Sequence, residues 1–363
     1  MIDLSLVSDG GIGWLDASGP ESHLVLSTRV RLARNLTGRP FPVRSVEPDR
    51  EQVLGAIRSA ASEIPSMACA HCIRLHELPR LDRQLLHERH LVSKELAAPE
   101  SDVPPRSGTA VLLQDGLGLM VNEEDHLRLQ ALTSGLSLES AWGLVGKLDS
   151  ELGQRLAFAF HAEFGYLTSC PTNVGTGLRA SILIHLPGLV LTKEINKVLQ
   201  SLVQVGLTFR GLYGEGSEVV GNFFQLSNQT TLGKSEVELL DHLAKIVRQV
   251  VGYEERAREV LLRDAPGVIE DKVWRAYGLL RYARTLSFEE AMNLLSGIRL
   301  GVGLGLIPEV GMYTLNKLLI FTQPAHLSAT AGDEVAEEDV PVHRADYVRA
   351  VLEEEAGRSS RET

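Results

Sequence analysis

Cysteine and aromatic residues are scarce in this chain of 363 residues. It has 3 cysteines, and phenylalanine, tryptophan and tyrosine together make up 5% of it. Three cysteines cannot form a disulfide framework, which favours a reducing compartment. Cys69 and Cys72 form a single C-x-x-C sequence around His71, and no second pair of ligands at similar spacing follows. The pattern therefore favours two ordinary cysteines over a structural zinc site.

The sequence also lacks the apolar run of about 18–20 residues that a membrane-spanning helix requires. Its best candidate, residues 301–321, is interrupted by Pro308, Glu309 and Lys317. The N-terminal segment has neither the basic nor the apolar region of a signal peptide. We therefore expect a soluble, cytoplasmic protein that does not bind a membrane.

Basic residues are fewer than acidic ones, 36 against 47, and the formal net charge is −11. Residues 328–363 contain ten acidic residues and four arginines, so this tail carries −6 of the total. The acidity is therefore mostly a property of the tail, as is typical of a solvated face. It argues against nucleic acid as a direct partner and permits a basic protein as substrate.

The length suggests about two domains. Short alternating segments and glycines up to residue 228 predict mixed α and β structure, and the remainder follows a helical period. A composition shift at residues 251–256 places the domain boundary after residue 254. Four signals predict helix starts. They are Ser235 with Glu238, Pro266, Ser287 with Glu290, and Pro341.

A strand predicted over residues 23–31 carries two arginines on one face. Ser27, Arg29 and Arg31 have the same parity, so the two arginines lie about 7 Å apart along the strand. Neighbouring guanidinium groups repel each other, and such a pair is suited to an anion. The alternative is a pair of surface arginines on an edge strand.

Asp115-Gly116 predicts a hairpin between residues 109–114 and 117–122. Residues 126–130 then alternate, which predicts that the chain is extended from Glu124 onward. In that conformation Glu124, His126, Arg128 and Gln130 share a face, and the intervening leucines enter the core. Glu124 and Arg128 would then lie about 13 Å apart, which suits a guanidinium at one end and a phosphate chain at the other.

Two further segments combine glycine with groups that carry chemistry. Cys170 begins a Gly/Thr/Asn-rich turn that ends at Arg179 and leads into an alternating strand over residues 179–186. Such a turn brings backbone N–H groups near an anion. Arg210 and Glu215 lie on a glycine-rich loop, which predicts either a mobile lid over an active site or a plain flexible loop.

Together, the four segments resemble the guanidino kinases, which include the creatine and arginine phosphagen kinases. The matching residues are 27–35, 122–128, 170–181 and 210–218, in the family's order, and the resemblance covers residues 23–254. Phosphagen kinases have a helical domain of roughly 100 residues before the first motif. This chain lacks that domain and has a helical segment after residue 255, an arrangement that resembles the bacterial protein arginine kinases.

The resemblance implies an α+β fold. Residues 1–254 would form the guanidino kinase catalytic domain, an antiparallel sheet flanked by helices. Residues 255–363 would form an all-helical C-terminal domain for regulation, phosphoarginine binding or dimerisation.

The resemblance also implies roles for individual residues. Glu124 and Glu215 would hold and activate the substrate guanidinium, with Cys170 beside it. ATP would bring Mg²⁺ with it, and no residue of the chain is assigned to a metal. His90 matches the family's adenine-contacting histidine, although a structural histidine is the alternative. The predicted ATP-binding residues are Ser27, Thr28, Arg29, Val30, Arg31, His90, Arg128, Arg179, Ala180, Ser181, Ile182, Leu183, Arg210, Gly211, Leu212, Tyr213, Gly214 and Glu215.

The family's C-terminal domain carries a phosphoarginine-receptor motif, R-D-x-x-R-A. Asp346 and Arg349 occupy two of its positions here, and Ala345 replaces the first arginine. Arg344 precedes Ala345 and is rotated by about 100° around a helix, so it replaces the lost contact only if the helix end is irregular. The alternative is an ordinary solvated helix with an intrahelical ion pair.

The implied function is ATP-dependent phosphorylation of arginine side chains in proteins, linked to the stress response. The implied partners are proteins with exposed arginines, such as basic transcriptional regulators, together with an activator subunit, a Clp protease and a second copy of the chain. One alternative is a phosphagen kinase that acts on free arginine or a small guanidino compound. Another is a phosphoarginine-binding adaptor with an inactive kinase domain. A DNA-binding regulator is disfavoured by the charge.

Overall fold

The computed structural model describes residues 8–98, 101, 103–212, 219–332 and 334–362. Eight strands form one sheet in the order β2-β3-β4-β5-β1-β8-β10-β9, and each neighbouring pair is antiparallel. The strands are β1 (Val25–Arg34), β2 (His71–Arg74), β3 (Ala110–Gln114), β4 (Leu117–Val121), β5 (Leu127–Ser134), β8 (Leu178–His185), β9 (Leu207–Arg210) and β10 (Phe223–Asn228). A separate small hairpin pairs β6 (Phe160–His161) with β7 (Gly165–Tyr166).

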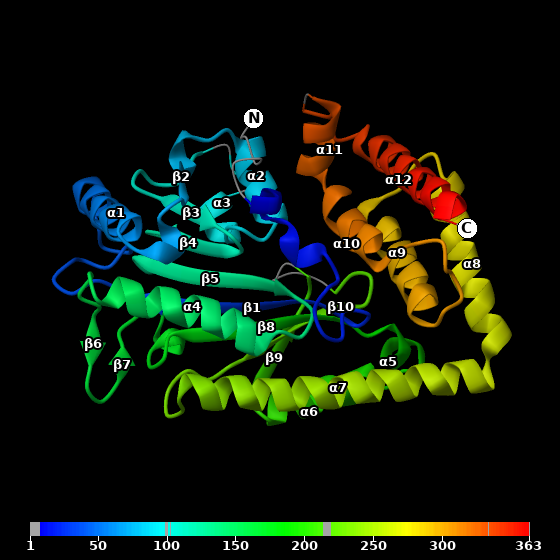
Figure 1. The fold of residues 1–363 in the computed structure, drawn as a ribbon, viewed down its shortest axis with the longest axis horizontal. Helices are drawn as coiled ribbons and strands as arrows, with labels where there is room; N and C mark the ends of the chain where they lie inside the picture. Colours follow the sequence, from blue (N-terminus) through cyan, green and yellow to red (C-terminus); the bar gives the residue numbers. More distant parts are fainter. Residues whose placement is uncertain (1–7, 99–100, 102, 213–218, 333, 363) are drawn as a thin grey trace.

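Helices lie around the sheet and continue beyond it (Figure 1). Those before residue 236 are α1 (Glu47–Ser62), α2 (Arg80–Glu88), α3 (Lys94–Ala97), α4 (Leu138–Gly153), α5 (Pro187–Leu191) and α6 (Ile195–Gln204). The later ones are α7 (Glu236–Asp264), α8 (Pro266–Tyr282), α9 (Phe288–Gly303), α10 (Met312–Phe321), α11 (Pro324–Ala331) and α12 (Val340–Glu362). Short 3₁₀ turns are η2 (Ser8–Gly11), η3 (Gly13–Leu15), η4 (Pro65–Met67), η5 (Leu75–Glu77) and η6 (Pro171–Asn173).

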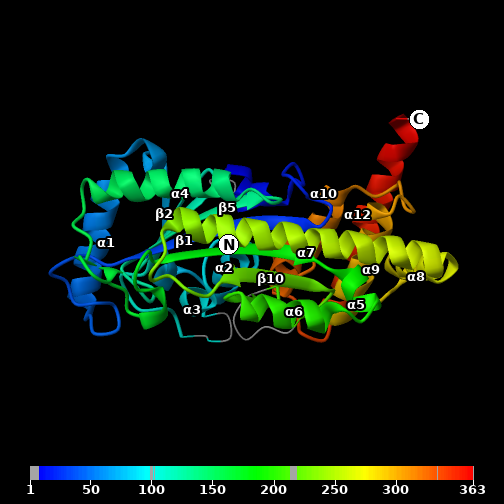
Figure 2. The ribbon, with the colours of Figure 1, turned by 90° about the horizontal axis from the view of Figure 1, so that it is seen from below.

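One face of the sheet is packed against helices. Helix α4 packs against β1 and β5, and α7 packs against β8 and β10. Figure 2 shows α4 and α7 running alongside the central strands. Val30 and Leu32 of β1 and Ile182 of β8 are fully buried in this core. Because side chains alternate along a strand, the residues between them point to the opposite face of the sheet.

The predicted hairpin is confirmed. Strands β3 and β4 pair from Ala110 opposite Val121 to Gln114 opposite Leu117. Asp115 and Gly116 both have positive φ, 45° and 76°, as a type I′ turn requires.

The predicted helix starts are also confirmed. The Ser235 hydroxyl accepts from the Glu238 N–H at 3.3 Å, and the Glu238 carboxylate accepts from the Ser235 N–H at 2.8 Å. Ser287 is the N-cap of α9, α8 begins at Pro266, and α12 begins one residue before Pro341. The boundary predicted after residue 254 falls inside α7, which continues to residue 264.

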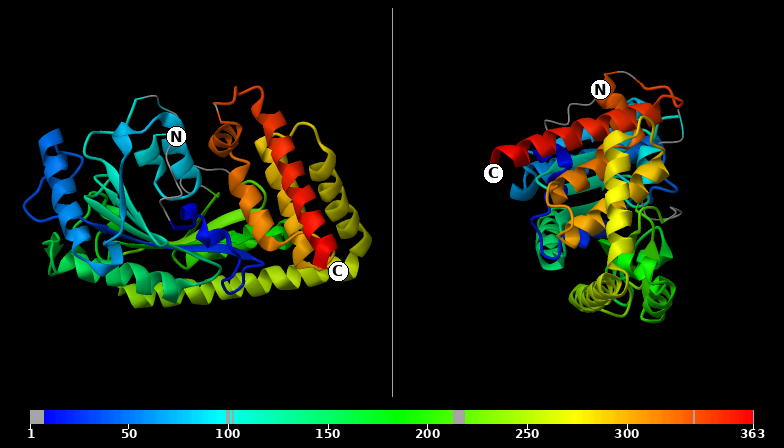
Figure 3. Two further views of the ribbon diagram at one scale, coloured as in Figure 1. Left: turned by 45° about the horizontal axis from the view of Figure 1, so that its top comes forward. Right: turned by 90° about the vertical axis from the view of Figure 1, so that its right-hand side faces the viewer.

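Helices α8, α9, α10 and α12 surround a second core at one end of the sheet (Figure 3). Leu26, Leu183, Leu212 and Phe223 come from the sheet region and are buried in this core. The C-terminal helices therefore pack directly on the strands. The α+β prediction, an antiparallel sheet flanked by helices and followed by a helical region, is confirmed. Within the described ranges, the structure contains no helix with both the length and the apolar character needed to cross a membrane.

Candidate functional site

Five arginines share the face of the sheet that is opposite the main helix layer. Arg31 of β1 pairs with Arg179 of β8, and on its other side with Gln130 of β5. Residues directly opposite each other in antiparallel strands point to the same side, so Arg29 and Arg128, two residues away along their strands, join them. The three central strands thus bring together four arginines that lie far apart in the sequence.

The fifth arginine is placed by β10. Gln225 pairs with Leu183 on one side and with Arg210, the last residue of β9, on the other. The Gln225 Oε1 also accepts from Arg29 Nη2 at 3.2 Å. Gln225 therefore joins the arginine face, although nothing in the sequence indicated this before the strand register was known.

The arginines destabilise one another's charge. Burial and the nearby Arg128 and Arg179 lower the pKa of Arg29 to about 10. The pKa of Arg31 lies well below its usual value, because of burial first and then of Arg29, Arg128 and Arg179. Among the described residues, the buried Nε of Arg31 has no hydrogen-bond partner. Several desolvated cations and an unpaired donor on one face suit a polyanion such as a phosphate chain.

The prediction of a continuous extended segment from Glu124 to Gln130 is wrong. Residues 122–126 form a bend that begins at Asn122 with φ 57°, and β5 starts only at Leu127. The bend folds Glu124 back, so that its carboxylate lies 3.3 Å from the Arg128 guanidinium, where about 13 Å was predicted. Glu123 lies closer still, at 2.6 Å from Arg128.

His126 is a further correction, because it does not share the face of Arg128. Its side chain is fully buried, its Nδ1 accepts from the Leu36 N–H at 3.0 Å, and its Nε2 lies 3.0 Å from the Pro40 carbonyl. It therefore holds the chain after β1. The two leucines predicted to enter the core, Leu127 and Leu129, are buried there.

Glu124 is suited to accept a proton. Its side chain is 40% exposed on the arginine face. Partial burial raises the pKa of this carboxyl above its ordinary value, with Asp125 and Glu123 adding to the shift and Arg128 opposing it. A carboxylate with a raised pKa is a better general base near neutral pH.

The Cys170 loop is tied to the Glu124 bend through a buried carboxylate. Asp125 Oδ1 accepts from the Ser169 N–H and from Asn35 Nδ2, both at 2.6 Å. Asn35 also accepts from the His126 N–H at 2.9 Å. These bonds fix the segment that carries Glu124 relative to the segment that carries Cys170.

Arg34 supports the same loop from the other side. Its guanidinium forms an ion pair with Asp149 at 2.8 Å, donates to the Thr176 carbonyl at 2.8 Å, and lies 3.4 Å from the centre of the Tyr166 ring. Cys170 itself is a partly exposed free thiol, and its Sγ lies 3.0 Å from the Thr172 hydroxyl.

A small cavity lies beside Arg29, between strands of the sheet and the segment that follows α2. His90 borders it, in a left-handed conformation with φ 60°. Burial and the nearby Arg29 hold the pKa of His90 well below its ordinary value, so the ring is neutral. The neutral ring and the leucines beside it offer an apolar surface to a nucleobase, and the cavity of about 20 Å³ must widen to admit one. The lining residues are Ser27, Arg29, His90, Leu132, Ser181, Leu183, Leu212 and Gln225.

Several predicted ATP-binding residues do not reach this face. Thr28, Val30, Ala180 and Ile182 are buried on the opposite side, because they alternate with the residues that face the cavity. Their side chains therefore do not face the arginines, and their role in ATP binding stays a prediction. Gly211 follows Arg210 at the end of β9. Tyr213, Gly214 and Glu215 lie outside the described residues.

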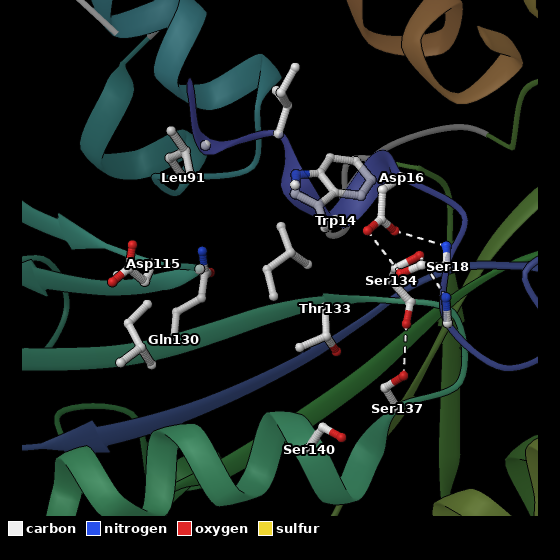
Figure 4. Close-up of a pocket in the computed structure, with 18 of the residues that line it drawn as sticks. Trp14, Asp16, Ser18, Leu91, Asp115, Gln130, Thr133, Ser134, Ser137 and Ser140 are labelled. Carbon is white, nitrogen blue, oxygen red and sulfur yellow. Dashed lines mark hydrogen bonds between the residues drawn. The ribbon is translucent and has the colours of Figure 1, made fainter. Parts of the chain in front are cut away.

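The cavity has a larger neighbour beyond Leu132. This hollow of about 900 Å³ lies between the η2–η3 segment and the strand pair β4–β5, and Figure 4 shows Trp14, Asp16 and Asp115 around it. Its described lining residues include neither lysine nor arginine. It is therefore less suited to a phosphate than the arginine face.

The receptor-motif residues lie in the C-terminal helices. Asp346 and Arg349 form an ion pair on α12, and Arg349 also donates to the Ala283 carbonyl. Ala345 is fully buried, and Arg344 points inward, where it donates to the carbonyls of Thr322 and Leu286. Arg344 therefore does not replace the missing arginine of the motif.

Both parts of the chain match known protein families. Residues 52–257 match the family "ATP:guanido phosphotransferase, C-terminal catalytic domain", and residues 266–363 match the family "Protein-arginine kinase McsB C-terminal domain". The protein-arginine kinase of Symbiobacterium thermophilum is 47% identical over 350 residues, which are 96% of this chain and 98% of the relative. This chain belongs to the protein-arginine kinase family. The protein-arginine kinase of Desulforamulus reducens is 45% identical and covers 93% of the chain, with 95% of its own length.

The fold of this chain is also similar to that of solved guanidino kinase structures. A crystal structure of lombricine kinase superposes with a TM-score of 0.57 at 24% identity, and covers 66% of this chain and 70% of its own. The resemblance to the bacterial protein arginine kinases that the sequence motifs indicated is therefore confirmed. The chain is an ATP:guanido phosphotransferase.

Sequence reasoning missed four residues of the site. Glu123 is adjacent to Glu124, so the paired carboxylates were a usable signal. Asn35 and Asp125 lie inside the matched motifs, but their contact with each other is visible only in the structure. Gln225 had no local signal at all.

Proposed function

We propose that this chain transfers the γ-phosphoryl group of ATP to the guanidinium group of arginine side chains in proteins. The observation that carries the proposal is the meeting of Arg29, Arg31, Arg128 and Arg179 beside Glu124 on one face of the sheet. The arginines suit the phosphate chain, and the carboxylate suits the acceptor.

The acceptor requires a base. A guanidinium has a pKa above about 12 and arrives protonated, with its lone pair delocalised. Glu124 fixes the plane of the guanidinium through hydrogen bonds and takes a proton from the attacking nitrogen as the N–P bond forms. Its raised pKa makes it a stronger base than an exposed glutamate. Glu215 is proposed as the second carboxylate.

The arginines stabilise the phosphoryl group in transfer. Charge spreads over its equatorial oxygens, and each charge-assisted contact contributes about 1.5–3 kcal/mol. Arg31, whose Nε is unpaired in the described structure, is the clearest donor to a phosphate oxygen. Binding of the polyanion also relieves the repulsion among the four cations.

Mg²⁺ is proposed as a companion of ATP. Among described side chains, the three that converge closely enough to hold a metal ion together are the exposed Glu21 and Glu255 and the half-buried His23, which are not part of the arginine cluster. Glu123 and Glu124 are the carboxylates beside the cluster, and both contact Arg128. This donor set fits an ion held mainly by phosphates and water, and Glu123 and Glu124 would accept hydrogen bonds from its waters. When bound, the ion would neutralise phosphate charge.

Proteins are the proposed acceptors, rather than free arginine. The support is the match of residues 266–363 to the C-terminal domain of protein-arginine kinases, together with the near full-length similarity to enzymes of that name. Free-arginine phosphagen kinase activity is the alternative. An adaptor without activity is disfavoured because Glu124 and the arginines are arranged for catalysis.

The test is incubation with Mg-ATP and either a basic protein or free arginine, followed by mass spectrometry for acid-labile phosphoarginine. We expect the label on the protein. Turnover of free arginine with none on the protein would reject the proposed substrate class, and no turnover of either would favour the adaptor.

The biological setting is also a proposal. The acidic tail of residues 328–363 favours basic substrates, for which transcriptional regulators are proposed. An activator subunit, a Clp protease, homodimer formation, a cytoplasmic location and a role in the stress response are proposed on the family resemblance.

A further inference from the structure

The last residue of α2 joins the catalytic region to the C-terminal helices. Glu88 is 7% exposed, and its carboxylate accepts from the N–H groups of Ala325 and His326 at 3.0 and 3.1 Å. These are the first free N–H groups of α11, which begins with Pro324. Figure 1 shows α2 and α11 side by side. The carboxylate of one region therefore caps a helix of the other.

The His326 ring completes this contact. Its Nδ1 lies 2.6 Å from the Glu88 carboxylate, and its Nε2 accepts from Arg89 Nε at 3.1 Å. Because Nε2 is an acceptor, the proton of the neutral ring is on Nδ1 and is donated to Glu88. Arg89 also donates to the Gly10 carbonyl and lies over the Phe321 ring. Two consecutive residues at the end of α2 are thus held by α11 and α10.

The next residue is His90, which borders the cavity beside Arg29. Its φ of 60° is unusual for a residue with a side chain, and such a conformation persists only where its surroundings hold it. Its carbonyl accepts from Gln130 Nε2 at 2.8 Å, and its ring meets the Trp14 ring edge-on at 5.4 Å. Figure 4 shows Trp14 and Gln130, with Leu91, around the neighbouring hollow.

We propose that Glu88 and His326 form a coupling contact through which the C-terminal helices hold His90 in the position that binds the base of ATP. Glu88 is a positioning residue in this arrangement, since it touches α11 and not the nucleotide. The inference rests on the proposed function, because it takes the cavity beside His90 as the nucleotide site. It assigns to the C-terminal region a direct effect on nucleotide affinity.

Helix α12 is bound beside the same end of α11 that Glu88 caps. Arg344 donates from Nε to the Thr322 carbonyl at 2.9 Å and from Nη1 to the Leu286 carbonyl at 2.8 Å. Thr322 lies between α10 and α11, two residues before Pro324. A displacement of α12 is therefore transmitted to the start of α11, where Glu88 is bound.

The chain offers a closely matched control. Glu254 is a fully buried carboxylate that accepts from the N–H groups of Gly188 and Leu189 at 2.8 and 2.9 Å. These residues begin α5, which also starts with a proline, and Arg258 donates to Glu254 at 2.7 Å. Glu254→Gln therefore removes the same kind of charge from the same kind of helix start, without touching the His90 segment.

The experiment measures the Kd of a non-hydrolysable ATP analogue by calorimetry and the KM and kcat for ATP in kinase assays. We expect Glu88→Gln to raise Kd and KM about three- to tenfold with kcat nearly unchanged, and Glu254→Gln to leave all three near wild type. In a His90→Ala background, Glu88→Gln should have no further effect on Kd, because the two act as one unit.

Each outcome decides the proposal. Equal Kd values for wild type and Glu88→Gln, or an undiminished effect of Glu88→Gln in the His90→Ala background, would overturn the coupling. If Glu88→Gln does not fold, His326→Asn decides, since it removes the acceptor for Arg89; an unchanged Kd there overturns the proposal. A wild-type protein that binds no ATP analogue would instead reject the proposed function.

Discussion

The Ser169 N–H donates to the Asp125 carboxylate at 2.6 Å, and this bond joins the loop of Cys170 to the bend of Glu124. Asp125 is fully buried, and its other contact to Asn35 anchors it to the end of β1. Asp125 therefore fixes the positions of Glu124 and Cys170 relative to each other. Both are proposed to contact the substrate guanidinium, whereas Asp125 itself need not.

Asp125→Leu should separate these two loops. We expect kcat to fall by about 10–10²-fold, because small displacements of reacting groups are costly, while the Kd of an ATP analogue stays close to wild type. Steady-state kinetics and calorimetry on the same preparation test this. Equal losses in kcat and in ATP affinity would show general disruption and not a positioning role.

Glu124→Gln should lower turnover by about 10²–10⁴-fold, since an amide cannot accept the guanidinium proton. ATP affinity should change little, because Arg128 keeps its shorter ion pair with Glu123 at 2.6 Å. Glu215→Gln is expected to behave similarly. A large loss of ATP affinity with normal turnover at saturation would contradict the role given to Glu124.

Arg31→Gln should weaken ATP binding and stabilise the protein without ATP. Loss of one phosphate contact is expected to raise Kd about 10–100-fold. Removal of one of several repelling, desolvated cations should raise Tm by about 2 °C in the absence of nucleotide. Arg34→Gln, on the same strand, is the control: it loses the ion pair with Asp149, and its Tm should fall. If Arg31→Gln has a lower Tm than wild type without ATP, the repulsion argument is wrong.

Features of the site that depend on residues close together in the sequence could be predicted, and features that depend on distant residues could not. The parity of Arg29 and Arg31, the Asp115-Gly116 turn and the Ser235–Glu238 cap are local, and all were predicted correctly. The bend before Leu127 was missed because alternation of residues 126–130 continued a strand pattern, whereas the native bend is held by distant groups. The His126 N–H donates to Asn35, 91 residues away, and the Leu36 N–H donates to the His126 ring, 90 residues away. A pattern of alternating residues along the sequence cannot predict contacts between segments so far apart.

Acidification should destabilise the protein from about pH 6.5 downward. Burial lowers the pKa of His87, His90, His126 and His185 below the ordinary value of 6.5. Below pH 6.5 the unfolded chain binds protons at these sites before the folded chain does, so stability is lost as the pH falls. Thermal unfolding between pH 7.5 and 5.5 should show a decreasing Tm.

His185 offers a test of that assignment. It is fully buried against Phe223, and its Nε2 lies 2.8 Å from the Ser296 hydroxyl. His185→Gln should make the dependence of Tm on pH shallower, whatever its effect at pH 7.5. The exposed His161 provides the control, and His161→Gln should keep the wild-type slope. Identical slopes for wild type and His185→Gln would contradict the assignment.

The altered receptor motif should bind phosphoarginine weakly. Asp346 accepts from Arg349 and is 57% exposed, so this carboxylate is available to a guanidinium, whereas the Arg349 side chain is 18% exposed and also donates to the Ala283 carbonyl. The first position of the motif offers no cation, because it is occupied by the buried Ala345 and because Arg344 donates to two carbonyls instead. We expect millimolar phosphoarginine to shift activity or Tm, and Arg349→Ala to reduce that shift. Arg263→Ala, which removes an exposed arginine paired with Asp264, is the control and should keep the full response. If phosphoarginine changes neither quantity in the wild-type protein, the motif has lost its receptor role, and the Asp346–Arg349 pair is an ordinary intrahelical ion pair.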